Sequence, residues 1–229
     1  MKRKIITTSD GSKTIQIEDW NEQYHSIHGA LQEANHVFIK HGLLFFCSEF
    51  ISESHEKSIN VLEIGFGTGL NAFLTLIKAE ELAIKINYTG VEAYPVSKEE
   101  LTQLDYADFI SPNHRFYFES MHHINWEKRL VISPVFSLLK QEKFFKDISD
   151  QNEFDLIYFD AFGARVQPGL WTESIFEKMF TALRDNGVLV TYSAKGSVRR
   201  AMEAVGFKVE RLPGPPGKRE MLRAQKMRA

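Results

Sequence analysis

The sequence predicts an α/β fold with a mostly parallel sheet, and three observations support this prediction. Apolar stretches of strand length alternate with amphipathic helical stretches, which is typical of strand–helix–strand units. A glycine turn at residues 65–69 joins one such strand directly to a helix. Two of the strands end in a carboxylate, at Glu92 and Asp160. Because ligands of open α/β sheets bind outside the carboxyl ends of the strands, we expect a site at these positions.

The glycine turn and its flanks at residues 61–71 read Val-Leu-Glu-Ile-Gly-Phe-Gly-Thr-Gly-Leu-Asn. A strand that enters a helix through glycines brings backbone N–H groups and a helix N-terminus to one place, and lets a ligand approach closely. A dinucleotide fingerprint would need glycine at position 70, where this chain has Leu70. Glu63 would repel a pyrophosphate, but it suits the cationic amino and sulfonium groups of S-adenosylmethionine. A Rossmann unit for another nucleotide is the competing interpretation.

The next strand, at residues 86–92, favours the S-adenosylmethionine interpretation. It ends in Glu92, 23 positions after Gly69. A carboxylate about 20 residues past the glycine turn accepts hydrogen bonds from ribose hydroxyls. Taken alone, Glu92 would be interpreted as a solvated loop carboxylate. Together with the glycine turn, the ribose role is the better interpretation.

Residues 1–57 precede the expected core at residues 58–229, and we expect the two parts to form a single domain. Within the N-terminal part, residues 13–17 alternate as a short strand, and residues 24–38 have a helical apolar face with unusually dense polar groups. Those polar groups indicate either capping hydrogen bonds or a lid over the cofactor. His25 and His28 have no further ligand at a metal-site spacing, so we expect no metal.

The second half of the chain alternates strands and helices after an aromatic, loop-rich stretch at residues 105–128 that gives no clear pattern. A helix capped by Ser97 precedes that stretch. The expected elements that follow are strands at 129–132, 135–140, 154–160 and 188–192, helices at 144–148, 172–183 and 196–205, and a closing hairpin at 207–212 and 219–224.

Composition narrows the class of protein. The single cysteine, Cys47, excludes an internal disulfide and a multi-cysteine metal cluster. There is no apolar run of membrane-spanning length and no apolar signal core after the basic start, so we expect a cytoplasmic protein without membrane contact. The net charge of −2 hides an asymmetry: residues 194–229 carry ten Lys/Arg against three Glu. Such a segment indicates either a polyanion partner or a solvated basic tail.

Several motifs resemble the methyltransferase domain of MnmC, a bifunctional tRNA-modifying protein. The matching segments are residues 8–14, 24–30, Glu33, 36–38, 63–71, 159–162, 168–172, 197–200 and 218–222. The resemblance runs nearly end to end. The oxidase domain of MnmC has no counterpart in a chain of this length, so the stand-alone form of the methyltransferase is expected.

The resemblance implies a class I S-adenosylmethionine-dependent methyltransferase fold, which is Rossmann-like, with an N-terminal extension and a closing C-terminal β-hairpin. It implies S-adenosylmethionine as cofactor, S-adenosylhomocysteine as product and tRNA as partner. The implied reaction converts 5-aminomethyl-2-thiouridine at the wobble position to 5-methylaminomethyl-2-thiouridine. A separate oxidase, or the enzymes that install the aminomethyl group, would act together with this protein.

The motifs also supply candidate site residues. Asp160 is expected to position the acceptor amine and to stabilise the charge that develops on its nitrogen. The expected cofactor contacts are Tyr24, Glu33, Glu63, Gly65, Phe66, Gly67, Gly69, Asn71, Glu92 and, where the family has Gly-Asp near the adenine, Gln141. The expected tRNA contacts are Phe162 and Trp171 by stacking and Arg199, Arg200, Lys218 and Arg219 by charge. Core packing is the competing interpretation for both aromatic residues, and more so for Trp171.

Two other functions remain open at this point. A small-molecule amine methyl- or aminopropyltransferase would need no polyanion surface, so the basic C-terminal segment argues against it. A non-catalytic module that holds S-adenosylmethionine or RNA is the other alternative. The joint presence of Tyr24, Glu92 and Asp160 argues against such a module.

Overall fold

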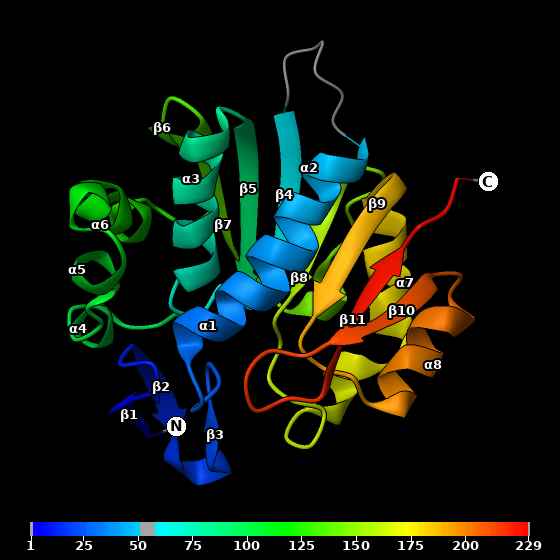
Figure 1. The fold of residues 1–229 in the computed structure, drawn as a ribbon, viewed down its shortest axis with the longest axis horizontal. Helices are drawn as coiled ribbons and strands as arrows, with labels where there is room; N and C mark the ends of the chain where they lie inside the picture. The colour runs from blue at the N-terminus through cyan, green and yellow to red at the C-terminus, as the bar shows by residue number, and fades with distance from the viewer. Residues whose placement is uncertain (1, 51–57, 229) are drawn as a thin grey trace.

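The computed structural model describes residues 2–50 and 58–228, and an eight-stranded sheet forms the centre of this described part (Figure 1). The strand order is β10-β11-β9-β8-β4-β5-β7-β6. In chain order these strands are β4 (Ser58–Ile64), β5 (Lys85–Glu92), β6 (Leu130–Ser133), β7 (Phe136–Glu142), β8 (Phe154–Phe159), β9 (Leu183–Thr191), β10 (Lys208–Pro213) and β11 (Glu220–Gln225).

The middle of the sheet is parallel and its two sides are antiparallel. β4 pairs in parallel with β5 and β8, and β5–β7 and β8–β9 are also parallel pairs. β6 runs antiparallel to β7 on one side, and the β10–β11 hairpin joins β9 antiparallel on the other. The expected mostly parallel sheet with a closing C-terminal hairpin is therefore confirmed.

Both faces of the central strands are buried, so β4 carries apolar side chains toward both of them. Ile59 and Val61 enter one hydrophobic core, whereas Leu62 and Ile64 enter the other. Side chains that alternate between two cores cannot show the apolar–polar alternation of a half-exposed strand. Glycines follow β4 at once, so the chain leaves the sheet at its carboxyl edge.

Helices cover both faces of the sheet. α3 (Leu70–Leu82) and the π-helical segment η2 (Asn35–Leu44) pack into the first core, and α7 (Glu173–Ala182) and α8 (Gly196–Ala204) pack into the second. The remaining helical elements are η1 (Glu18–Trp20), α1 (Ala30–Ala34), α2 (Phe45–Phe50), α4 (Lys98–Leu101), α5 (Tyr106–Ile110), η3 (Pro112–His114), α6 (Arg115–His123), η4 (Phe145–Asp147) and η5 (Pro168–Trp171).

Two parts of the chain hold more structure than the sequence indicated. The N-terminal segment forms a small antiparallel sheet of β1 (Arg3–Thr7), β2 (Lys13–Ile17) and β3 (Glu22–Gln23), which lies below the main sheet in Figure 1. Residues 105–128, which gave no clear pattern, contain α5, η3 and α6. These helices are short, so an apolar repeat of 3.6 residues had too few turns in which to appear.

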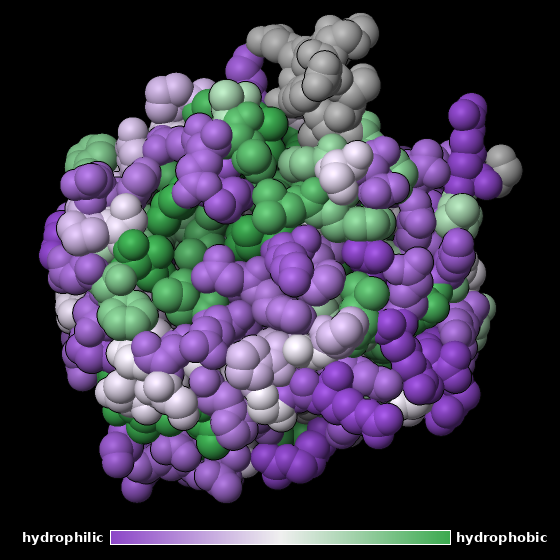
Figure 2. All heavy atoms as spheres, viewed as in Figure 1, coloured by the Kyte–Doolittle hydropathy of each residue, from purple (hydrophilic) through white to green (hydrophobic). Residues whose placement is uncertain are grey.

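The surface has a hydrophobic and a hydrophilic part. In Figure 2 hydrophobic residues gather over α2 and α3, whereas hydrophilic residues cover α8 and the C-terminal strands. None of the helices within residues 2–50 and 58–228 combines the length and the apolar character needed to cross a lipid bilayer.

Candidate active site

A cavity of about 470 Å³ opens at the carboxyl ends of β4, β5 and β8. Its walls come from the glycine turn, the ends of these strands, the N-terminal segment and the β10–β11 loop. The expected residues that line it are Tyr24, Glu33, Glu63, Gly65, Phe66, Gly67, Asn71, Glu92, Asp160, Phe162 and Lys218. The fold therefore brings together expected residues that are far apart in the sequence; Tyr24 and Lys218, for example, are separated by 194 positions.

The glycine turn has no room for side chains at two positions. Gly65 has a φ of +90°, and a Cβ there would lie 2.6 Å from the carbonyl oxygen of Asp160. Gly67 has a φ of +49°, and its Cβ would lie 3.0 Å from the Tyr24 ring. Gly69 is the N-cap residue of α3, so it supports the turn although it does not itself line the cavity. The turn needs glycine because both the backbone angles and the close neighbours exclude other residues.

Glu92 connects the glycine turn to the end of β5. Its Oε2 accepts a hydrogen bond from the Gly67 backbone N–H at 3.1 Å, and its Oε1 accepts one from the Tyr94 N–H at 2.9 Å. Each carboxylate oxygen can accept more than one hydrogen bond, so Glu92 keeps capacity for the hydroxyls of a ligand. The side chain is 9% exposed and lies on the cavity wall.

Asn71, in the first turn of α3, joins two carboxyl groups of the cavity wall. Its Nδ2 donates to Glu63 Oε1 and to Asp160 Oδ2, both at 2.9 Å. Glu63 Oε2 and Asn71 Oδ1 are buried and have no hydrogen-bond partner among the described residues. Burial raises the pKa of Glu63 well above its usual range, and the nearby Asp160 adds to this effect. The Tyr88 hydroxyl beside Glu63 is also buried without a partner in the described part of the chain, so the hydrogen bonds of this polar cluster are incomplete, and a ligand that donates to Glu63 and Asn71 would lower the cost of burying them.

Asp160 follows the last residue of β8 and is half-buried. Burial, together with the nearby Glu33 carboxylate, raises the pKa of its carboxyl group to about 7. The hydrogen bond from Asn71 and the charge of Lys218 act in the opposite direction. A carboxyl group with a pKa near neutrality can accept a proton at physiological pH, which is a property that the sequence could not reveal.

The N-terminal segment forms the wall opposite the strand ends. Tyr24 packs against the Phe162 ring with centroids 5.0 Å apart, and the Trp20 and Phe162 ring centroids are 5.7 Å apart. Glu33 is 6% exposed, and its Oε2 accepts a hydrogen bond from the Ser26 N–H at 2.8 Å. Tyr24 and Glu33 therefore line the cavity, whereas His28, Gln32 and His36 of the same segment do not.

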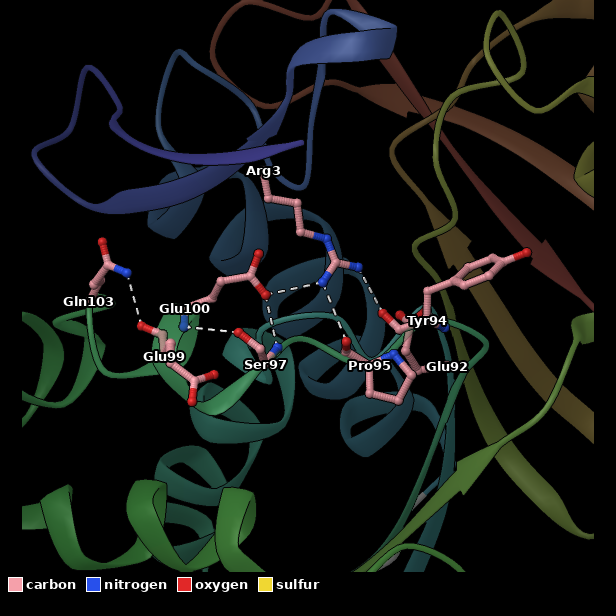
Figure 3. Close-up of polar contacts among 8 residues, drawn as sticks. All are labelled: Arg3, Glu92, Tyr94, Pro95, Ser97, Glu99, Glu100 and Gln103. Carbon is pink, nitrogen blue, oxygen red and sulfur yellow. Dashed lines mark hydrogen bonds and ion pairs between the residues drawn. The ribbon is translucent and has the colours of Figure 1, made fainter. Parts of the chain in front are cut away.

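Arg3 of β1 attaches the small sheet to the segment after β5 (Figure 3). Its guanidinium donates to the carbonyl oxygens of Tyr94 and Pro95 at 2.9 and 3.3 Å and to Glu100 Oε2 at 3.1 Å. Glu100 also belongs to the capping box of α4 with Ser97. The partners of Arg3 are more than 90 positions away in the sequence, so no local pattern could have identified its role.

Gln141 requires a correction. It does not line the cavity but faces a second hollow, together with Asn60, Asn87, Thr89 and Arg129. Gln141 lies opposite Val91 in the β5–β7 register, and Val91 enters the second hydrophobic core. Because side chains alternate along a strand, this register directs Gln141 to that face. The residues after β7 that do line the cavity are Phe144, Phe145 and Lys146.

The expected tRNA contacts separate into two groups. Phe162 and Lys218 line the cavity, whereas Trp171, Arg199, Arg200 and Arg219 do not. Trp171 is 5% exposed and packs on Phe159, and its Nε1 donates to the Phe162 carbonyl at 2.8 Å. The core-packing interpretation therefore holds for Trp171. Arg199 forms an ion pair with Glu203 at 2.8 Å, and Arg200 and Arg219 are exposed.

Sequence reasoning missed Gly90, which shapes the wall from within β5. A Cβ at this position would lie 2.3 Å from the Phe66 ring, so the ring occupies the space that a side chain would need. An isolated glycine inside a strand often marks such a close approach, and this signal could have identified it. Trp20, Arg3 and Tyr192 also line the cavity and had no comparable signal.

The chain resembles known proteins in sequence and in fold. Residues 98–227 match a family described as S-adenosyl-L-methionine-dependent methyltransferase. The tRNA 5-methylaminomethyl-2-thiouridine biosynthesis bifunctional protein MnmC of Leptospira interrogans is 29% identical over 219 residues, which cover 90% of this chain and 32% of the relative. The protein of the same name from Methylobacillus flagellatus is 26% identical over 222 residues, with 89% and 32% covered. The chain thus spans about a third of the length of these curated relatives.

Two solved structures agree with the predicted fold class. MNMC2 from Aquifex aeolicus superposes with a TM-score of 0.78 at 24% identity, covering 97% of this chain and 70% of that chain. Spermidine synthase from Thermotoga maritima gives a TM-score of 0.52 at 15% identity, covering 97% of this chain and 72% of that chain. At these identities the likeness concerns the fold, and it confirms the Rossmann-like α/β class.

Proposed function

The chain belongs to the family of S-adenosyl-L-methionine-dependent methyltransferases, and we propose from this premise that it methylates the 5-aminomethyl group of the wobble uridine in tRNA. The product would be 5-methylaminomethyl-2-thiouridine. The observation that carries this proposal is the likeness to MnmC over 90% of the chain. It is supported by the position of Asp160, whose carboxyl group faces the cavity beside the glycine turn.

The family's cofactor is S-adenosylmethionine, and the cavity wall has suitable groups for it. The unpartnered acceptors of Glu63 and Asn71 would bind the amino group, and Glu92 would bind ribose hydroxyls. Gly67 allows close approach of the ligand to the backbone. When bound, the cofactor supplies an electrophilic methyl group, and S-adenosylhomocysteine leaves with the electron pair of the broken S–C bond.

The cavity lining contains more carboxyl groups than cationic groups, which suits an amine as the acceptor. Its acidic lining residues outnumber its basic ones: Glu22, Glu33, Glu63, Glu92 and Asp160 against Arg3, Lys146 and Lys218. A primary amine is largely protonated near pH 7 and must lose a proton before its lone pair can bond to the methyl carbon. Asp160, with a pKa raised to about 7, would accept that proton and hold the nitrogen in place.

The test compares wobble nucleosides by mass spectrometry in tRNA from cells with and without this protein. Cells that lack it should accumulate 5-aminomethyl-2-thiouridine and lose the methylated nucleoside. Wild-type protein should restore the product, whereas Asp160→Asn, expressed to the same level, should not. An unchanged nucleoside profile in the deletion strain would contradict the proposal.

A second assay separates tRNA from small amines. Purified protein with S-adenosylmethionine should methylate tRNA that carries the aminomethyl group, but not putrescine. Methylation of putrescine with no reaction on tRNA would instead favour a small-molecule amine methyltransferase.

A further inference from the structure

The loop between β10 and β11 reaches out of the main sheet to the segment before and within α1 (Figure 1). His36 Nε2 lies 2.8 Å from the Pro213 carbonyl oxygen at the start of this loop. Gly217 has a φ of +81°, and a Cβ there would lie 2.1 Å from the His28 ring. The loop and the N-terminal segment therefore pack closely, and glycine at position 217 makes this contact possible.

Lys218 is the charged residue at the centre of this contact. Its Nζ forms an ion pair with Glu33 Oε1 and lies 3.8 Å from the centroid of the Tyr192 ring. The Tyr192 hydroxyl in turn donates to the carbonyl oxygen of Ala161 at 2.8 Å, next to Asp160. The Lys218 side chain is 30% exposed and that of Glu33 is 8% exposed. A cation held by a buried carboxylate and an aromatic face has little freedom to follow a phosphate.

We propose that Lys218 is a positioning residue of the acceptor site rather than a phosphate contact: it holds Glu33 beside Asp160 and fastens the β10–β11 loop over the cavity. The role of Lys218 in methyl transfer rests on the proposed function. The electrostatic effect of Lys218 on Asp160 does not, because it acts within the protein whether or not a substrate is bound.

The charged and titratable groups around Asp160 come from five parts of the fold. They are Glu63 on β4, Tyr88 on β5, Glu33 on α1, Tyr192 after β9 and Lys218 on the loop, and Asn71 of α3 bridges Glu63 and Asp160. Glu33 raises the pKa of Asp160, whereas Lys218 lowers it. Removing each charge should therefore move the titration of Asp160 in opposite directions.

The first experiment follows the Asp160 carboxyl carbon by NMR in full-length protein labelled with ¹³C-aspartate, with Asp160→Asn to assign the signal. Lys218→Met should raise the titration midpoint by about half a pH unit or more, and Glu33→Gln should lower it. Lys218→Arg, which keeps the charge, should stay near the wild type. Gly217→Ala should move the loop off His28 and shift the midpoint in the same direction as Lys218→Met, without changing any charge.

The second experiment measures tRNA methylation against pH and salt. In Lys218→Met the acid limb of kcat should move to higher pH, while the Michaelis constant for tRNA and its salt dependence stay near those of the wild type. Lys208→Met is the matched control, because Lys208 is exposed and its ammonium group has no partner among the described residues. It should leave the pH profile unchanged.

The outcomes separate the two roles. A higher Michaelis constant and a flatter salt dependence in Lys218→Met, with an unmoved Asp160 midpoint, would identify Lys218 as a phosphate contact and overturn the proposal. Midpoints that fail to move in opposite directions in Lys218→Met and Glu33→Gln would also overturn it. If wild-type protein methylates no tRNA, the proposed function fails, and the NMR titration still decides the role of Lys218.

Discussion

Two hollows adjoin the same central strands, and they differ in how far their polar side chains are hydrogen-bonded to one another. The second hollow, of about 300 Å³, is lined by Asn60, Asn87, Thr89, Arg129 and others. There Asn87 Nδ2 donates to Asn60 Oδ1 at 2.9 Å, and Arg129 donates to Thr89 Oγ1 at 2.9 Å. In the first cavity, buried acceptors of Glu63 and Asn71 have no partner among the described residues.

This difference distinguishes a structural network from a candidate binding site. A polar network that satisfies itself stabilises the fold and offers little to a ligand. Buried acceptors without donors destabilise the fold, and the cost can be recovered when a ligand supplies the donors. Substitutions in the first cavity should therefore affect binding or turnover, and those in the second should affect stability.

The largest expected effect is tested with two aspartates, one within β8 and one directly after it. Asp160→Asn should lower turnover at least about tenfold, because a charge-stabilising and proton-accepting group is removed. Asp155, at the other end of β8, accepts from the Asn60 N–H at 2.8 Å and pairs with Arg184. Asp155→Asn is the matched control and should leave kcat near the wild-type value. Near-normal single-turnover methylation by Asp160→Asn would show that this residue is structural.

One substitution in each hollow should separate cofactor binding from stability. Glu63→Gln should weaken S-adenosylmethionine binding by about tenfold or more, since hydrogen bonds to charged groups contribute about 1.5–3 kcal/mol. Its thermal stability should stay equal or rise, because a buried carboxyl group is removed. Arg129→Met should lower the unfolding free energy by about 0.5–1.5 kcal/mol with cofactor affinity unchanged. Calorimetry measures the cofactor affinity, and denaturant unfolding measures the stability. An equal loss of affinity in the two variants would show that the two hollows do not differ in function.

The raised pKa of Asp160 predicts that the free energy of unfolding falls as the pH rises. The group titrates near 7 in the folded protein and near 3.8 when unfolded, so its favourable contribution is complete below about pH 4 and is lost as the pH rises through 7. Asp160→Asn should therefore raise Tm at pH 8, by about 2–4 °C for each kcal/mol of relief in a chain of this size. The difference should vanish at pH 4. A constant difference at both pH values would mean that Asp160 titrates normally.

The smallest expected effect concerns cations outside both hollows. Arg199→Ala with Arg200→Ala should raise the Michaelis constant for tRNA and lower the slope of its salt dependence by about 1–2, while S-adenosylmethionine affinity is unchanged. Because Arg199 is already paired with Glu203, Arg200→Ala alone should give most of the effect. Activity at several salt concentrations measures this slope. A double variant that follows the wild-type curve would show that tRNA docks elsewhere.

The sequence was most informative where chemistry is encoded locally. The glycine turn, Glu92 and the end of β8 at Asp160 are short stretches in which residue type, spacing and strand pattern all indicate the same site. Gln141 was misplaced because the part of this segment that lines the cavity comes after the end of β7, at Phe144, Phe145 and Lys146. The register of Gln141 is set by pairing with β5, which the sequence of β7 alone does not specify.

By itself, the sequence determined the α/β class, the parallel centre, the closing hairpin and the carboxylates at the strand ends, because each depends on a local period or on the backbone freedom of glycine. Only the tertiary structure placed Arg3 on the segment after β5 and Lys218 on Glu33, since these contacts join residues 91 to 185 positions apart. It also raised the pKa of Asp160 to about 7. Burial and neighbouring charges set that value, and both exist only when the chain is folded.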